Sequence, residues 1–346
     1  MKVFLTAFLT TPFVDHDVPG TALAHLIAEE VLNRAGLPES ALDEAVFTGL
    51  DDREVREAFP HRVPVYSGGG TPARAAREVL QAVELLRAGK SRAVLLGAVQ
   101  AQAAPVAHRP PRELLLWAKA RGVGRVMLDE TVLQGLARYR AFTARVEYFE
   151  LLQPFFLPKG EWRLVAEDAF PLADLSPAKL GMEPPLSPAS WDFLTRFHLP
   201  PSARGACGCV LVGEELAEGH PFPAMAEIGQ TVPSVAPEDW PDGAAAYALT
   251  QMDHPGRPDA LFSGAPSAVD EAVFAGFVRN AGDPAFGCEA VNPWGSDLAA
   301  GWAAGCSLVR RLGFAAAWLH GEERRRALVL ETLAGPAGLG LELLRP

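Results

Sequence analysis

The first hundred residues alternate between short apolar runs and segments with the apolar spacing of a helix. In the segment 21–35, Leu23 and Ile27 fall on one helical face, and Gly36 follows as a natural C-terminal stop. Residues 93–96 are continuously apolar, which is typical of a strand buried on both faces. The pattern predicts strands at 2–9, 44–50, 63–66 and 93–96, and helices at 21–35 and 71–89.

The second half of the chain continues this alternation with less regular spacing. We expect strands at 209–212, 224–228, 314–319 and 327–331, a helix at 267–278, and another helix that ends near 312. Alternating strands and helices indicate an α/β fold with a largely parallel sheet. The stretch from Glu150 to Leu199 is different, because it is rich in Pro, Phe, Trp and Leu and has weak periodicity. It is too apolar for a disordered linker, so we interpret it as an inserted or capping region.

The bulk composition excludes several classes of protein. Apolar residues make up 49% of the chain and charged residues 21%, as in ordinary globular proteins. The formal net charge of −11 argues against a general nucleic-acid binder, which needs a basic surplus to neutralise phosphates. No apolar run reaches the ~18–20 residues needed to span a bilayer. Four cysteines are too few for a dense disulfide framework, so we expect a cytoplasmic protein with reduced thiols.

One region departs from the acidic average. Residues 108–145 contain eight Lys or Arg and three acidic residues. Such a region is either a basic face that steers an anionic partner or a solvated helix face without a partner. The sequence leaves both interpretations open.

The stretch from Asn292 to Ser307 resembles the histidine-bearing C-terminal motif of the thiolase superfamily, N-P-x-G-G-x-x-x-x-G-H-P-x-G-A-[ST]. Its asparagine, its proline and the glycines at 295, 301 and 305 fall at matching spacing. Further segments follow in the order of the family. Residues 205–216 resemble the ketosynthase run G-E-G-A-G-V-L-V-L-E-E-L. Residues 263–272 stand where ketosynthases carry H-G-T-x-T…D-x-x-E, and residues 333–340 resemble the terminal glycine-rich turn of the family.

This resemblance implies a thiolase-like fold with two pseudo-repeated α/β halves in a layered α-β-α-β-α architecture. We expect an N-terminal half at 1–218, with the insertion at about 150–200, and a C-terminal half at 219–346. The resemblance also implies a dimer that forms through the strand after the nucleophile helix, here at about 93–97.

The same resemblance implies a chemistry for which this chain lacks the residues. The family uses a cysteine thiolate at a helix N-terminus to hold the acyl chain, together with two histidines or a histidine and an asparagine. Here the strand-to-helix turn contains Ser67 and no cysteine. Ser263 stands at the first histidine, and the second is replaced by Trp302 in a thiolase alignment or by Asp297 in a ketosynthase alignment. An indole N–H only donates and serine is a poor nucleophile without a base, so we expect no ordinary condensation.

Three functions are compatible with these residues. The one we expect is a non-catalytic, chain-length-factor-type partner of an active ketosynthase in fatty acid or polyketide biosynthesis, which also meets an acyl carrier protein. The second is an unusual acyltransferase that uses Ser67 or another nucleophile. The third is a homodimer that binds acyl-CoA or another acyl thioester without turnover. We predict no metal or cofactor, and neither nucleic acid nor a membrane as a partner.

Overall fold

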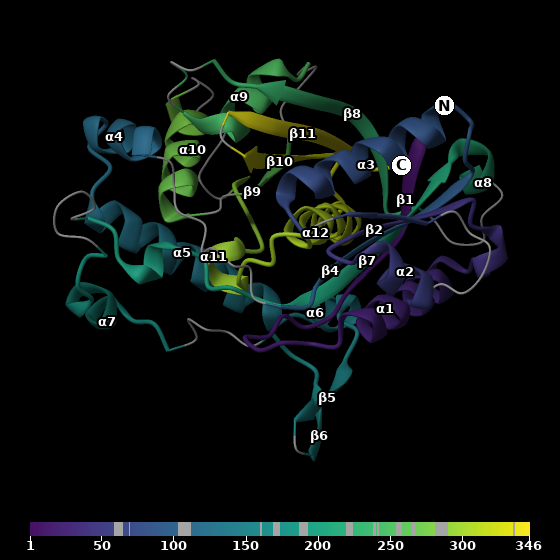
Figure 1. Ribbon diagram of the computed structural model, residues 1–346. Helices are drawn as coiled ribbons and strands as arrows, with labels where there is room; N and C mark the ends of the chain where they lie inside the picture. The colour runs from purple at the N-terminus through teal and green to yellow at the C-terminus, as the bar shows by residue number, and fades with distance from the viewer. Residues whose placement is uncertain are drawn as a thin grey trace.

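The computed structural model describes residues 1–58, 65–68, 70–102, 112–159, 161–168, 174–186, 193–218, 224–237, 240, 242–253, 258–264, 267–280, 290–334 and 336–346 (Figure 1). The N-terminal half consists of β1 (Val3–Thr10), α1 (Gly20–Ala35), β2 (Glu44–Thr48), α2 (Asp52–Ala58), β3 (Val65–Gly68), α3 (Pro72–Arg87), β4 (Ala93–Gln100) and β7 (Gly205–Gly213). Helix α1 ends at Ala35, and Gly36 caps it with a left-handed φ of 63°, which confirms the predicted stop. Thr71 caps the N-terminus of α3, because its hydroxyl accepts the Arg74 N–H at 3.2 Å.

The C-terminal half repeats this arrangement. Its elements are β8 (Ala226–Val235), α9 (Gly243–Gln251), β9 (Ala260–Gly264), α10 (Ala268–Asn280), α11 (Asp297–Ala300), α12 (Ser307–Gly321), β10 (Arg326–Ala334) and β11 (Ala337–Leu344). A short helix, α8 (Glu214–Glu218), follows β7. The predicted boundary near residue 219 falls in 219–223, outside the described residues, and stays a prediction.

Strand pairing shows the internal repeat. In the first half β2 pairs in parallel with β3 and β4, and β7 pairs antiparallel with β4 and β1. In the second half β10 pairs in parallel with β9, and β11 pairs antiparallel with β10 and β8. A parallel bridge from Leu261 to Val291 takes the place that β3 has in the first half. Strands β1 and β8 join the halves into one sheet of order β3-β2-β4-β7-β1-β8-β11-β10-β9.

The helices form three layers around the two half-sheets (Figure 1). Helix α1 packs on β1, β4 and β7, and α9 packs on β8, β10 and β11. Helices α3 and α12 contact strands of both halves and therefore lie between them. Side-chain alternation along β4 produces this arrangement, because Val94 and Leu96 belong to the central core and Leu95 and Val99 to the core under α1. The expected layered α-β-α-β-α architecture is therefore present.

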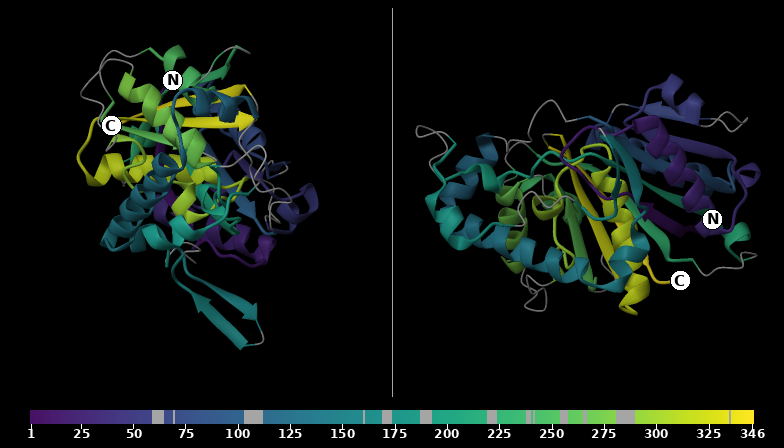
Figure 2. Two further views of the ribbon diagram at one scale, coloured as in Figure 1. Left: turned by 90° about the vertical axis from the view of Figure 1, so that its left-hand side faces the viewer. Right: turned by 90° about the horizontal axis from the view of Figure 1, so that it is seen from below.

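The connection from β4 to β7 is a long excursion that includes the Glu150–Leu199 stretch. It carries α4 (Arg112–Ala120), α5 (Arg125–Thr143), α6 (Val146–Leu151), β5 (Phe155–Lys159), β6 (Glu161–Val165), α7 (Pro177–Met182) and a 3-10 turn at Arg196–His198. Helix α5 packs against α10 and α11, so this excursion covers the C-terminal half. The β5–β6 hairpin projects away from the body of the molecule (Figure 2).

Three sequence-based expectations are wrong. The predicted strand at 314–319 is part of α12, because a fully buried helix has no polar face to reveal its period. The sheet is mixed rather than largely parallel, since β1, β7, β8 and β11 pair antiparallel. The segment 93–97 cannot extend a sheet across a dimer, because β4 already pairs with β2 and β7.

Candidate functional site

The loops that precede the two central helices meet between the halves. A Cβ atom added to Gly305 would lie 3.0 Å from Gly70 Cα, so the two loops touch through backbone. The Thr48 hydroxyl donates to the Gly305 carbonyl at 2.9 Å and fixes this approach. Ser67 precedes the contact on β3, where its backbone pairs with Phe47. The glycine contact leaves no room for a side chain at the point where the loops meet.

Ser263 lies at the end of β9, deep in the C-terminal half. Its backbone N–H donates to Asn292 Oδ1 at 2.8 Å, and Asn292 holds a left-handed φ of 47°. The Ser263 hydroxyl is buried and has no hydrogen-bond partner among the described residues. The asparagine of the motif therefore holds the backbone at the position where the family carries its first histidine.

Asp297, the first residue of α11, is part of a buried ion cluster. Its Oδ2 accepts from Arg311 Nη2 at 2.5 Å, and the same guanidinium also pairs with Glu331 on β10. Burial raises the pKa of Glu331 to about 7, although the Arg311 charge opposes this shift. A Cβ atom on Gly264 would lie 2.5 Å from Glu331 Oε2, so the glycine makes space for the cluster. Asp297 is thus held in an internal ion pair.

Two further acids lie at the start of α10. The Ser267 hydroxyl donates to Asp270, and burial raises the pKa of Asp270 to about 6. Burial also raises the pKa of Glu271, while the positive charge of Arg138 opposes that shift. The neighbourhood of Ser263 is therefore rich in carboxyl groups that burial makes weaker acids.

Trp302 lies on another side of the motif, at a seam with the excursion. It is 8% exposed, its backbone N–H donates to the Pro201 carbonyl at 2.8 Å, and its own carbonyl accepts the Ala203 N–H at 3.1 Å. Trp294 is also buried and stacks on Phe142 with ring centroids 4.1 Å apart. Both indoles therefore occupy interior volume. The cavity that remains beside Asp297 and Arg311 measures about 30 Å³, room for a single water molecule.

A second buried ion pair, which the sequence analysis missed, joins α12 to the excursion. Arg310 Nη2 donates to Asp168 Oδ2 at 2.8 Å, and both side chains are buried. Tyr139 and Tyr148 also donate to Asp168, and burial raises the pKa of both phenols, which keeps them protonated. The sequence feature that could have predicted this pair is Arg310-Arg311 inside an otherwise apolar segment, because buried arginines require acidic partners.

The structure brings together two of the four sequence-predicted positions. Ser263 and Asp297 share one cluster, linked through Gly264, Glu331 and Arg311. None of the described residues in this cluster is a histidine or a cysteine. The described cysteines Cys207, Cys209 and Cys306 are buried, and burial raises the pKa of Cys209 and of Cys306. Cys209 and Cys306 are therefore thiols rather than reactive thiolates, and Cys288 lies outside the described residues.

Among the residues that the structure describes, neither a metal cluster nor a membrane-spanning helix is present. Within the described part of the chain, three or more His, Cys, Asp or Glu side chains nowhere gather in a way that suits a metal ion. Of the described helices, none has both the length and the apolar character needed to cross a bilayer.

Comparison with solved structures identifies the fold. The chain superposes over its full length on an acetyl-CoA acetyltransferase from Bacillus anthracis, with a TM-score of 0.87, 17% identity and 99% of that chain covered. The fold is that of the thiolases. Human mitochondrial 3-ketoacyl-CoA thiolase gives a TM-score of 0.84, and an acetyl-CoA acetyltransferase from Syntrophomonas wolfei gives 0.83. Both are 14% identical to this chain, and each comparison covers 100% of this chain and 99% of the other. Neither models of known protein families nor curated proteins match the sequence.

Proposed function

We propose that this thiolase-fold protein is a non-catalytic partner of an active ketosynthase, comparable to a chain-length factor in fatty acid or polyketide assembly. The fold supports an origin among acyl-condensing proteins. The residues at the positions of the family's catalytic histidines stabilise the structure instead. Asp297 forms an ion pair with Arg311, and the Trp302 backbone forms hydrogen bonds with Pro201 and Ala203 in the connection between β4 and β7.

The observation that carries the proposal is the closed interior at the motif. An acyl thioester needs a channel, and pockets for small molecules are usually about 300 Å³ or larger. The cavity beside Asp297 measures about 30 Å³, and the Asp297 and Arg311 side chains that line it are engaged with each other in an ion pair. Turnover by this chain alone is therefore unfavourable, whereas a role in a complex needs neither a channel nor a nucleophile.

Intact-mass spectrometry after incubation with acyl-CoA and with acyl carrier protein thioesters tests the non-catalytic part. We expect no covalent adduct on the wild type and the same result for Ser67→Ala. An adduct that Ser67→Ala abolishes would show an unusual acyltransferase and overturn the proposal.

The partnership is tested by co-expression with active ketosynthases from the same organism. We expect co-purification as a heterodimer and a changed product chain length relative to the ketosynthase alone. The partnership would be contradicted if the ketosynthase had full activity and made the same products without this chain, and if light scattering showed no complex. Tight retention of acyl-CoA by a homodimer of this chain would favour a storage role instead.

A further inference from the structure

A buried histidine lies in the excursion, apart from the residues discussed so far. His198 ends the 3-10 turn at Arg196–His198, and its side chain is fully buried. Its Nδ1 accepts the Thr195 backbone N–H at 2.9 Å, and its Nε2 lies 2.8 Å from Asp129 Oδ1 on α5. The side chain therefore joins the returning segment of the excursion to the helix that packs on the C-terminal half.

The hydrogen bonds determine where the ring carries its proton. A ring nitrogen that accepts a backbone N–H holds no proton, so the neutral ring of His198 has its proton on Nε2 and donates it to Asp129. A second proton would have to bind Nδ1, where it would face the Thr195 N–H and break that hydrogen bond. The protonated ring therefore cannot keep both contacts of the neutral ring.

The surroundings of the ring favour its neutral form. Burial lowers the pKa of His198, the carboxylate of Asp129 opposes this shift, and the charge of Arg125 adds to it. Within the described part of the chain, these two α5 residues are the charged groups that act on the ring, because Arg196 of the turn pairs with Glu183. Since folding lowers the pKa, the contribution of the ring to stability is present above pH 6.5 and is lost as the pH falls.

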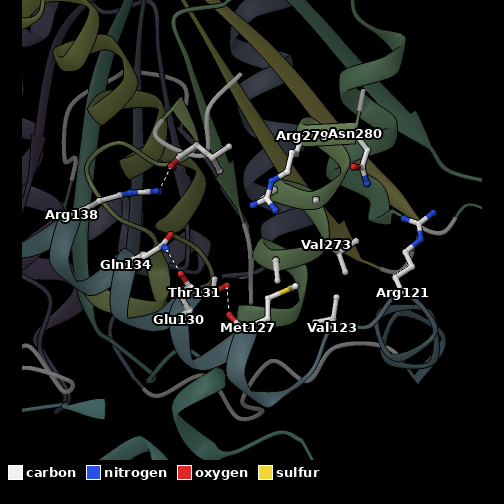
Figure 3. Close-up of a pocket in the computed structure, with 14 residues that line it drawn as sticks. Arg121, Val123, Met127, Glu130, Thr131, Gln134, Arg138, Val273, Arg279 and Asn280 are labelled. Atoms are coloured by element: carbon white, nitrogen blue, oxygen red, sulfur yellow. Dashed lines mark hydrogen bonds between the residues drawn. The ribbon is translucent and has the colours of Figure 1, made fainter. Parts of the chain in front are cut away.

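Helix α5 is a fixed support for this contact. Its Met127, Gln134 and Arg138 line a cavity of about 340 Å³ between α5 and α10 (Figure 3). Its packing against α10 and α11 does not involve the histidine. Helix α5 should therefore stay in place when the contact between His198 and Asp129 breaks.

The segment that follows the histidine leads directly to the motif. Three residues after His198, the Pro201 carbonyl accepts the Trp302 backbone N–H at 2.8 Å, and the Ala203 N–H donates to the Trp302 carbonyl at 3.1 Å. A change at the histidine therefore reaches the seam between the excursion and the motif through a very short piece of chain.

We propose that His198 is an acid-sensitive latch that holds residues 195–203 against α5 and over the motif at Trp302. Protonation of the ring breaks the bond from the Thr195 N–H and places a charge in a fully buried position, which favours the released segment. Leu194, just before the turn, is buried in the central core and keeps the excursion attached. Release therefore loosens the seam without unfolding either half. The latch does not depend on the proposed partnership with a ketosynthase.

Two measurements on the wild-type protein test the latch. Nitrogen-15 NMR of the imidazole rings reports the tautomer, and we expect the proton of His198 on Nε2 at pH 7.5. Hydrogen exchange followed by mass spectrometry compares residues 195–203 at pH 7.5 and at pH 5.5, after correction for the pH dependence of exchange itself. If the released ring titrates at 6.5, the opening equilibrium rises up to about tenfold per pH unit below that value, so we expect about tenfold less protection at pH 5.5.

The variant His198→Asn separates the latch from other effects of acid. The asparagine carbonyl can accept the Thr195 N–H but does not titrate, so the protection of residues 195–203 should be equal at the two pH values. His320→Asn is the matched control, because His320 is exposed near the end of α12, and it should keep the wild-type response to pH.

Several results would overturn the proposal. They are a neutral ring with its proton on Nδ1, equal protection of residues 195–203 at both pH values in the wild type, and a response to pH that persists in His198→Asn. Loss of protection spread over β1 and β7 would also overturn it, because it would indicate acid unfolding of the whole molecule. If His198→Asn does not fold, the two wild-type measurements decide the question.

Discussion

The Arg310–Asp168 pair should be a strongly coupled contact in this molecule. Both side chains are buried, and the guanidinium lies 3.9 Å from the centroid of the Phe13 ring and 5.0 Å from that of Phe314. Removing one partner of a buried pair leaves an uncompensated charge, which typically costs about 3–5 kcal/mol. We expect losses of that size in the free energy of unfolding for Arg310→Met and for Asp168→Asn.

A double-mutant cycle measured by urea unfolding at pH 7 isolates the coupling. The double variant buries no lone charge, so its loss should fall short of the sum of the single losses by about 2 kcal/mol. The exposed pair Arg53–Glu57 on α2 is the control, and its cycle should show no measurable coupling. If the losses at Arg310 and Asp168 simply add, to within about 0.5 kcal/mol, the pair is not an interacting unit and our reasoning fails.

Other substitutions test the packing, the electrostatics and the motif. Gly313→Ala should destabilise the folded protein by about 2 kcal/mol, because the new Cβ atom would overlap the Phe8 ring. Gly276→Ala should be neutral or should stabilise the protein by up to about 1 kcal/mol, since nothing lies within 4 Å of its added Cβ atom. Chemical denaturation measures both variants, and equal effects would contradict the packing around Gly313. The pKa of Glu331 rises from 4.5 to about 7 on folding, so its contribution is present below pH 4.5 and is lost as the pH rises to 7. Glu331→Gln should therefore change the stability difference from wild type by about 3 kcal/mol across that interval, and a constant difference would refute the shift. Trp302→His should lower the melting temperature and still give no acyl adduct by intact mass, so an adduct on this variant would show that only the imidazole was missing.

Local sequence patterns predicted the first half of the fold well. The strand at 2–9, the helix at 21–35 and its stop at Gly36 depend on short-range periodicity and on a left-handed C-cap, both visible in sequence. The prediction of a strand at 314–319, where the structure has α12, was wrong for a physical reason. Helix α12 is packed on all sides, so its apolar residues do not show the 3.6-residue period of a surface helix. Three consecutive alanines, from 315 to 317, were the remaining signal for a helix.

The candidate site was harder to predict, because its residues meet through long-range folding. The positions Ser263 and Asp297 could be found from the two segments that resemble the family, 263–272 and Asn292 to Ser307, but their neighbours could not. Asp168 is 142 residues before Arg310, and their contact depends on how the excursion folds back over α12. Sequence alone showed two charges in an apolar segment, which is a reason to look for acids but does not say where they lie.

The position of α12 has a consequence for how the molecule assembles. Residues of the central core come from β1, β4, β7, β10 and β11 together, with α12 as their common neighbour. A chain cut between β7 and β8 would give two fragments, each with one face of its half-sheet exposed to water. Neither fragment should form a native-like fold by itself, and mixing them should restore the fold only when both are present. Denaturation of the intact chain should correspondingly be one cooperative event rather than two, in spite of the repeat in its topology.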